Sequence, residues 1–276
     1  MSDLKGKVCV VTGAAGVLCS AMVEALLEEG AKVALIGRTE SKLIELQEKL
    51  SNKGLGETLV TAADVLNEED LREAKTKINT AFGPVDILIN GAGGNHPKAT
   101  SPAEQMTAAT AKEDSFFGMS MDAFGFVFDL NFKGTLLPCQ VFGEDMVDHK
   151  SGNIINISSM SADRPLTKVG AYSAAKSSVD SLTQWLAVHL APMNVRVNAL
   201  APGFFVTGQN RFLLYQEDGK TPTARGQKII NNTPMGEFGK PEDLKGAIKF
   251  LAGPGSRFVT GIILPVDGGF SAFSGV

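Results

Sequence analysis

The sequence is poor in cysteine and in aromatic residues other than phenylalanine. Its 276 residues include 3 cysteines, 1 tryptophan and 2 tyrosines. Cys9, Cys19 and Cys139 are far apart, lie in apolar surroundings and form no C-x-x-C pair, so the sequence supports neither a disulfide framework nor a zinc knuckle. We therefore expect free, buried thiols in a reducing compartment.

Clusters of like charge, targeting segments and membrane spans are also missing. The 26 basic and 30 acidic residues are dispersed, which argues against a nucleic-acid arm or a membrane-binding basic patch. No apolar run reaches the about 20 residues of a membrane span, and residues 1–7 lack the pattern of a signal peptide. Three scattered histidines without an H-x-x-x-H spacing argue against a catalytic metal. We expect a cytoplasmic protein that binds no nucleic acid, membrane or metal.

Short apolar runs alternate with longer amphipathic stretches along the whole sequence. Such runs are typical of parallel strands that are covered on both faces, and their alternation with helices implies right-handed βαβ units. Without repeats or a Pro/Ser-rich linker, we predict one α/β domain over residues 1–276, a Rossmann-like doubly wound parallel sheet of seven strands with helices on both faces. The predicted strands are 7–12, 32–36, 58–63, 85–90, 153–157, 195–201 and 259–266. The predicted helices are 17–29, 40–50, 67–82, 120–149, 172–191 and 241–252, and Gly125, Gly134 and Pro138 suggest a kink or two segments within 120–149.

Two irregular segments, about 94–119 and 208–239, interrupt this alternation. Each follows the carboxyl end of a predicted strand, where the ligand crevice of an open α/β sheet lies. We therefore interpret them as walls of a substrate site. The alternative is that they are disordered surface insertions.

Small residues follow the first predicted strand, where the backbone can approach a pyrophosphate at a helix N-terminus. Asp64 and the turn that begins at Asn90 fall on the same edge of the sheet, where an acid can accept a hydrogen bond from an adenine amino group. Three such turns indicate a dinucleotide cleft, although small residues there can also reflect tight packing. The candidate cofactor contacts are Gly13, Ala15, Gly16, Val17, Leu18, Asp64, Val65, Asn90 and Ala92.

Tyr172 and Lys176 are four residues apart and so share one helix face, while Ser159 closely follows the fifth predicted strand. A phenol titrates near pH ~10, and a nearby ammonium would lower its pKa enough for proton transfer at neutral pH. Ser159 could hydrogen-bond a carbonyl or alkoxide oxygen. The alternative is an ordinary Tyr/Lys pair on a helix surface.

Taken together, these motifs resemble the short-chain dehydrogenases/reductases, a family of NAD(P)-dependent oxidoreductases. The resemblance implies that Tyr172 is the acid/base, that Lys176 tunes its pKa and binds the cofactor ribose, that Ser159 orients the substrate carbonyl, and that Asn131 helps to anchor a relay water. It also implies a homotetramer built through the long helices and the C-terminal strand. The matching positions are Thr12-Gly13, Asp64, Asn90-Gly91-Ala92-Gly93, Asn131, Ser159, Tyr172-x-x-x-Lys176, Pro202-Gly203, Thr207 (a nicotinamide contact) and Val266-Asp267-Gly268-Gly269.

The sequence differs from the family pattern at the glycine-rich turn, T-G-x-x-x-G-x-G. Val17 and Cys19 stand at the last two glycine positions, and Gly16 comes one residue early. The end of the second strand lacks the carboxylate that binds the ribose hydroxyls of NAD. Gly37 stands there instead, followed by Arg38, which could pair with a 2′-phosphate. This favours NADP(H) over NAD(H), with stacking of Arg38 on adenine as the alternative.

Several runs resemble one branch of the family, the bacterial D-mannonate oxidoreductases (fructuronate reductases) of the short-chain type. They are 16–22, 91–97, 115–117, 201–205 and 267–270. The resemblance implies interconversion of D-fructuronate and D-mannonate, small sugar acids whose carboxylate needs a cation or several donors. His96 is of particular interest because it has no obvious packing role, although any of these candidates could be a solvated surface group. The candidate substrate contacts are Asn95, His96, Ser159, Arg164, Lys168 and Arg211.

Other functions remain open from the sequence. The same chemistry could act on another sugar acid, as in a gluconate 5-dehydrogenase, or on a 3-oxoacyl thioester, for which no basic patch is evident. A non-catalytic NAD(P)-binding sensor is the alternative from a different class. The presence of Ser159, Tyr172 and Lys176 counts against the sensor.

Overall fold

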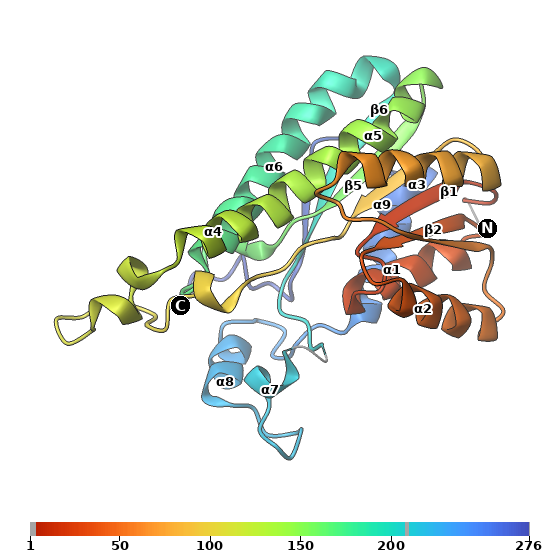
Figure 1. The fold of residues 1–276 in the computed structure, drawn as a ribbon. Helices are drawn as coiled ribbons and strands as arrows, with labels where there is room; N and C mark the ends of the chain where they lie inside the picture. The colour runs from red at the N-terminus through yellow and green to blue at the C-terminus, as the bar shows by residue number, and fades with distance from the viewer. Residues whose placement is uncertain (1–3, 208–209, 276) are drawn as a thin grey trace.

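The computed structural model describes residues 4–207 and 210–275 and confirms the predicted parallel sheet (Figure 1). All neighbouring strands pair in parallel, in the order β3-β2-β1-β4-β5-β6-β7. The order reverses between β1 and β4, and such a switch point is where doubly wound sheets bind their ligands. The strands are β1 (Val8–Thr12), β2 (Lys32–Gly37), β3 (Thr58–Ala62), β4 (Ile87–Asn90), β5 (Gly152–Ile157), β6 (Val195–Pro202) and β7 (Ile263–Val266).

Helices cover both faces of the sheet because successive strand residues point to opposite sides. Val11 and Leu35 belong to the core under one set of helices, and their neighbours Val10 and Ile36 belong to the core under the other. No helix within the described ranges is long and apolar enough to cross a membrane. The first set is α1 (Val17–Glu28), α2 (Glu40–Asn52) and α9 (Leu244–Ala252), and the second is α3 (Glu68–Ala81), α5 (Gly134–Asp148) and α6 (Gly170–Leu190).

The long helix predicted over 120–149 is divided into two segments, as expected, and the second begins at Gly134. It consists of α4 (Met121–Phe128), a π-helical turn over Asp129–Lys133, and α5. Pro138 lies inside α5 without ending it. Wide π turns of this kind occur often at functional sites, and this one contains Asn131.

The predicted strand 259–266 is shorter than expected, since only Ile263–Val266 forms β7. The carbonyl of Val259 accepts hydrogen bonds from the side chains of Arg196 and Asn198, and not from the backbone, of the neighbouring strand β6. Gly261 then takes a left-handed conformation, with φ of +82°. Side-chain bonds and a turn therefore replace the first half of the expected strand.

The two irregular segments contain short helices. Residues 94–119 extend away from the sheet beside α4, yellow to yellow-green in Figure 1, and carry three short 3₁₀ helices. In the second segment, of which residues 208–209 lie outside the described part, are α7 (Arg211–Leu214) and α8 (Ala224–Asn231). A bridge between Phe205 and Gly239 joins the two ends of this second segment, and the N–H of Met235 also bonds the carbonyl of Gly268 just after β7 at 3.1 Å. Neither is a structureless insertion in its described part.

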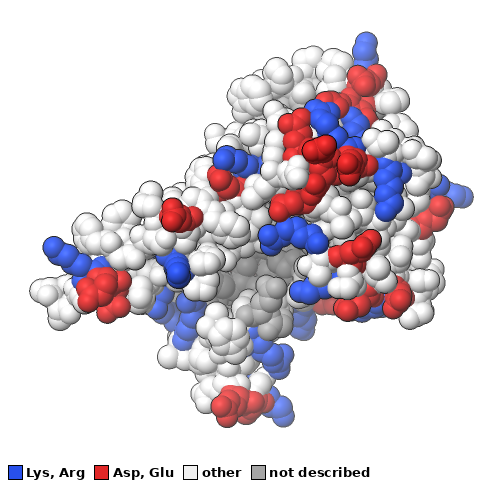
Figure 2. All heavy atoms as spheres, viewed as in Figure 1, with Lys and Arg blue, Asp and Glu red and all other residues white. Residues whose placement is uncertain are grey.

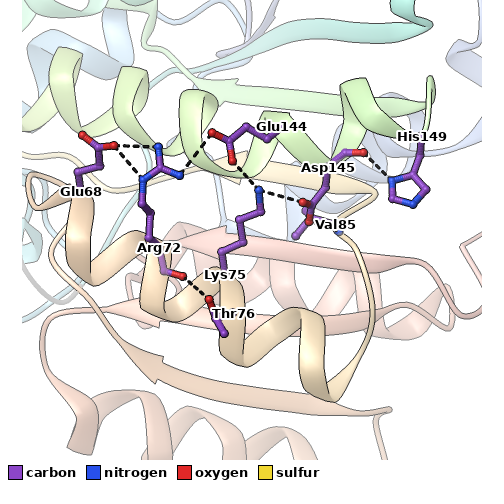
Figure 3. A network of polar contacts seen from close by, with 8 residues as sticks. All are labelled: Glu68, Arg72, Lys75, Thr76, Val85, Glu144, Asp145 and His149. Atoms are coloured by element: carbon purple, nitrogen blue, oxygen red, sulfur yellow. Dashed lines mark hydrogen bonds and ion pairs between the residues drawn. The ribbon is translucent and has the colours of Figure 1, made fainter.

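A network of ion pairs fixes α3 against α5, the helix that follows the π turn (Figure 3). The Lys75 amine lies 2.8 Å from Glu144 and 2.9 Å from Asp145. Asp145 is buried and also accepts a hydrogen bond from the backbone N–H of Val85. Although partial burial opposes it, hydrogen bonding to the two carboxylates raises the pKa of Lys75. Over the rest of the face in Figure 2, acidic and basic side chains are interspersed.

Candidate active site

The turns after β1 and β4 pack directly on each other. The hydroxyl of Thr12 accepts hydrogen bonds from the backbone N–H groups of Gly91 (3.1 Å) and Ala92 (3.2 Å). Gly13 has φ of +65°, and a Cβ there would lie 2.9 Å from the Ala92 backbone. Only glycine satisfies both conditions, so the two turns, which carry only small side chains, can pack backbone against backbone.

The altered glycine turn still presents a helix N-terminus. The N–H of Gly16 bonds the carbonyl of Gly13 at 2.8 Å, and α1 begins at Val17 with no side chain capping its first turn. The amides of Val17 and Leu18 therefore remain available to a phosphate. Cys19 fills the space above Gly91, with its Sγ 3.6 Å from the Gly91 carbonyl oxygen.

All three cysteines are free and buried, as expected. Burial raises the pKa of the Cys19 and Cys139 thiols to about 12 and also raises that of Cys9. Thiols in this state are poor nucleophiles. The cysteines therefore act as packing groups at neutral pH.

The other predicted cofactor residues lie at the carboxyl ends of β2, β3 and β4. Asp64 is half-buried, and its Oδ1 accepts a hydrogen bond from the Leu66 N–H at 3.0 Å. Arg38 is exposed and forms no ion pair with any residue that the structure describes. Asn90 differs from expectation, because its side chain is buried and donates to Asn156 Oδ1 at 2.9 Å. The Asn90 amide ties β4 to β5, which leaves only its backbone for a cofactor.

Ser159, Tyr172 and Lys176 meet where β5 ends and α6 begins. The buried Lys176 amine donates to the carbonyl of Ile157 at 2.7 Å and lies 5.6 Å from the centre of the Tyr172 ring. The Ser159 hydroxyl contacts the Tyr172 phenol and also accepts a hydrogen bond from Ser161 Oγ at 3.0 Å. The fold thus brings together the three side chains that the sequence indicated.

The pKa values at this site differ from the sequence-based expectation. Burial raises the pKa of Tyr172, and contact with the Ser159 hydroxyl only partly opposes this. Burial lowers the pKa of Lys176 to about 8. The expected net lowering of the Tyr172 pKa is therefore not found, because desolvation of the buried phenol is the dominant effect.

Asn131 positions the start of the 94–119 segment. Its amide donates to the carbonyls of Gly94 (2.7 Å) and Val127 (2.8 Å), and its Oδ1 accepts from the Gly94 N–H at 3.2 Å. A Cβ on Gly93 would lie 2.6 Å from Asn131 Oδ1 and 3.4 Å from Lys176 Nζ. The π turn therefore places Asn131 against the Gly-rich turn, and the backbone of Gly93 lies between Asn131 and Lys176.

The turn expected to contact nicotinamide is closely packed. Gly203 donates to the carbonyl of Val266 at 2.9 Å, and a Cβ there would lie 2.6 Å from Asp267 Cα. Pro202 ends β6, and Thr207 is half-buried, with its N–H bonded to Asn210 Oδ1 at 2.7 Å. The backbone at this position can approach a ligand closely.

Three predicted substrate contacts are bonded within their own segments. Asn95 donates to Thr100, and His96 Nδ1 accepts from the Lys98 N–H and its ring packs edge-on against a phenylalanine. His96 therefore does have a packing role, contrary to expectation. Arg211 donates to the Gly219 carbonyl at 2.9 Å, within the α7–α8 unit.

Two further candidates for substrate contact, Arg164 and Lys168, lie in the loop before α6. Arg164 is exposed and pairs with Asp163 at 3.3 Å. Lys168 has φ of +75°, an uncommon conformation for a residue with a side chain. It lines a cavity of about 250 Å³ between the 94–119 segment and the first turn of α6, together with Glu104 and Gly170. Of these two residues, Lys168 is therefore the better placed to contact a substrate.

The sequence did not reveal that the two irregular segments contact each other. Glu104 in the first lies 2.5 Å from Lys228 on α8. Lys228 holds the pKa of Glu104 below its usual range, and Lys168 and Arg225 act in the same direction. The partners are 124 residues apart, so no local pattern could signal them. No group of three or more metal-ligating side chains occurs among the described residues.

The chain is similar to known proteins over its whole length. Residues 7–217 match the family model described as short chain dehydrogenase. An uncharacterised oxidoreductase, UxuB, from Bacillus subtilis is 51% identical, covering 99% of this chain and 98% of its own. The 2-dehydro-3-deoxy-D-gluconate 5-dehydrogenase of Formosa agariphila is 34% identical, covering 99% and 96%.

A solved structure from Haemophilus influenzae agrees closely with this fold. It contains bound NAD, and D-mannonate oxidoreductase activity has been provisionally assigned to it. The identity is 44% and the TM-score 0.93, over 99% of this chain and 98% of the other. With the family model and these relatives, the motifs and the fold establish the identity of the protein at the level of the family. It belongs to the short-chain dehydrogenases, which are NAD(P)-dependent oxidoreductases.

Proposed function

We propose that this enzyme interconverts D-fructuronate and D-mannonate. The observation that carries the proposal is the meeting of Ser159, Tyr172 and Lys176 at the end of β5, beside the packed turns after β1 and β4 that can accept a dinucleotide. Bound nicotinamide supplies the hydride in reduction and takes it up in oxidation. In reduction, Tyr172 gives its phenolic proton to the carbonyl oxygen, so that a ketone, a hydride and a proton become an alcohol.

The neighbouring side chains support this proton transfer. The Ser159 hydroxyl orients the carbonyl oxygen, and the Lys176 ammonium stabilises the phenolate that forms. Asn131 keeps the Gly93–Gly94 backbone in place beside Lys176. Because burial raises the pKa of Tyr172, the phenol is protonated before reduction begins.

A sugar acid suits the mouth of this site because cations gather there. Lys168, Arg225 and Lys228 all act on the Glu104 carboxylate, and the cavity that Lys168 lines adjoins the helix that carries Tyr172. A substrate carboxylate can bind to the same cations. The provisional assignment of the Haemophilus influenzae protein supports D-mannonate as the specific substrate.

For the cofactor, we propose that both NADH and NADPH bind, with NADPH favoured. No carboxylate stands at the end of β2 to repel a 2′-phosphate, and Arg38 is exposed and without an ion pair among the described residues. The bound NAD of the Haemophilus influenzae protein supports use of the nonphosphorylated cofactor as well. We also propose a cytoplasmic homotetramer, for which the exposed Trp185 and Val188 on α6 provide apolar contact area.

The direct test is steady-state kinetics of the purified protein with a panel of substrates. We expect the highest kcat/KM for D-fructuronate and D-mannonate, measured with NADH and with NADPH. The comparison compounds are 5-ketogluconate, 2-dehydro-3-deoxygluconate derivatives and a 3-oxoacyl thioester. If D-fructuronate turns over no faster than 5-ketogluconate, the substrate proposal is wrong while the reaction class stands.

A further inference from the structure

A carboxylate lies in line with the two catalytic side chains on α6. Tyr172, Lys176 and Asp180 follow one another at intervals of four residues, so they share one face of the helix. Asp180 has no assigned role in the site above. In the sequence, Asp180 follows Lys176 by four residues, the same interval that separates Lys176 from Tyr172.

Asp180 is half-buried, and one of its two carboxyl oxygens is left without a full hydrogen bond. Its Oδ1 is buried without a hydrogen-bond partner among the residues that the structure describes. The hydroxyl of Ser158, at the end of β5, lies beside the carboxyl, but the geometry leaves Ser158 Oγ without a hydrogen bond as well. Buried polar atoms without partners are rare and destabilising.

The carboxylate therefore works against folding at neutral pH. Burial raises the pKa of Asp180, Ser158 and Lys176 oppose this, and Asp163 adds to it. An acid whose pKa is raised in the folded state favours folding when protonated, so ionised Asp180 destabilises the fold above that pKa. A destabilising group beside a catalytic pair is typical of a residue that is retained for function.

Lys176 is the group on which this charge acts. Burial lowers the pKa of the Lys176 amine to about 8, and only Cys19 and Asp180 are found to raise it. The Cys19 thiol is itself protonated at neutral pH, since burial raises its pKa to about 12. Asp180 is then the negative charge that favours the ammonium form of Lys176.

We propose that Asp180 is a positioning residue for the Tyr172–Lys176 pair, and that its carboxylate keeps the Lys176 amine charged through the working pH range. The inference rests on the proposed role of Lys176 in proton transfer, but not on the identity of the substrate. Asp180 touches neither substrate nor cofactor in this role and acts through Lys176.

The test is Asp180→Asn, a neutral replacement of the same shape, in the full-length protein. With any ketone that the wild type reduces, the fall of kcat/KM at alkaline pH should move to lower pH, because Lys176 loses its proton earlier. The loss should be small at pH 6.5 and grow to several-fold above pH 8. The Tm should stay equal or rise. Asp180→Glu should restore the wild-type pH profile at least in part.

A second readout needs neither substrate nor cofactor. In protein labelled with ¹³C-lysine, the Cε resonance of Lys176, assigned by its absence in Lys176→Arg, titrates well below the other lysines. Asp180→Asn should lower its midpoint, and the control Asp163→Asn, which removes an exposed charge, should not. The proposal would be overturned if Asp180→Asn left the titration midpoint of Lys176 unchanged. It would also be overturned if the pH profile of kcat/KM did not change, whether or not the Tm fell. If no sugar acid is a substrate, the substrate proposal fails, but this titration still decides the role of Asp180.

Discussion

Glu104 and Lys228 form an ion pair that joins the 94–119 segment to α8, with 2.5 Å between Oε2 and Nζ. The first segment follows β4 and the second follows β6, so the pair spans the end of β5, where Ser159 lies. Both side chains are largely exposed, and exposed pairs contribute little to stability. We therefore expect the contact to affect how the two segments lie together over the end of β5 more than the stability of the fold.

Glu104→Gln should loosen this closure without unfolding the protein. We expect KM for the sugar acid to change several-fold and kcat much less, with Tm nearly unchanged. The effect should shrink at high salt because exposed charges are screened. The matched control is Glu113→Gln, an exposed acid on the same segment for which no ion pair is found among the described residues. Equal effects of both variants would contradict a role for the pair.

Tyr172→Phe removes the proposed acid/base and keeps the ring. Turnover should fall by about 10²–10⁴-fold, the usual contribution of a positioned general acid, and cofactor affinity should change little. Fluorescence titration with NADPH measures the second quantity. Tyr215→Phe is the control, because Tyr215 packs against Phe238 in the α7–α8 unit. Retained turnover in Tyr172→Phe would remove this residue from the mechanism.

Arg38→Ala tests the choice of cofactor. An arginine–phosphate contact contributes about 1.5–3 kcal/mol, so kcat/KM for NADPH should fall by about 10–100-fold. The value for NADH should change by less than about threefold, because NADH has no 2′-phosphate. Lys42→Ala removes a nearby exposed cation and serves as the control. A parallel loss with both cofactors would show that Arg38 instead stacks on the adenine.

Gly93→Ala should impair catalysis more than stability. Its Cβ would meet Asn131 Oδ1 at 2.6 Å, so the amide must leave its bonds to Gly94. We expect kcat to fall at least tenfold and Tm by only a few degrees. Gly125→Ala is the control, because a Cβ there meets nothing within 4 Å. If Gly93→Ala kept full activity, the Asn131–Gly94 contact would be irrelevant to turnover.

Asp145→Ala should destabilise the fold strongly. It leaves the buried Val85 N–H without a partner and removes one of two carboxylates from Lys75, a loss of about 2–4 kcal/mol. Glu144→Ala removes the other, exposed carboxylate and should change the free energy of unfolding by only about 0–1 kcal/mol. Urea denaturation of both variants measures the difference. Similar values would mean that burial does not distinguish the two acids.

The sheet was predictable because each strand is a short apolar run between helices, and Tyr172 and Lys176 were predictable because their spacing is local. The start of strand seven was not, since Val259 is apolar but its carbonyl is bonded by side chains that are 61 and 63 residues away in the sequence. Likewise, the roles of Asn90 and His96 depend on contacts made only after folding. The pKa of Tyr172 could not be inferred, because the spacing shows the charge nearby but not the loss of solvent.

The segment that contains α7 and α8 begins and ends side by side, at the bridge between Phe205 and Gly239. The N–H of Gly239 bonds the carbonyl of Phe204 at 2.9 Å, so both ends of the excursion are fixed a few ångströms apart. Lengthening a loop whose ends are already joined changes its closure entropy only slowly. The length of this excursion can therefore change at little cost in closure entropy, while Ser159, Tyr172 and Lys176 keep their places.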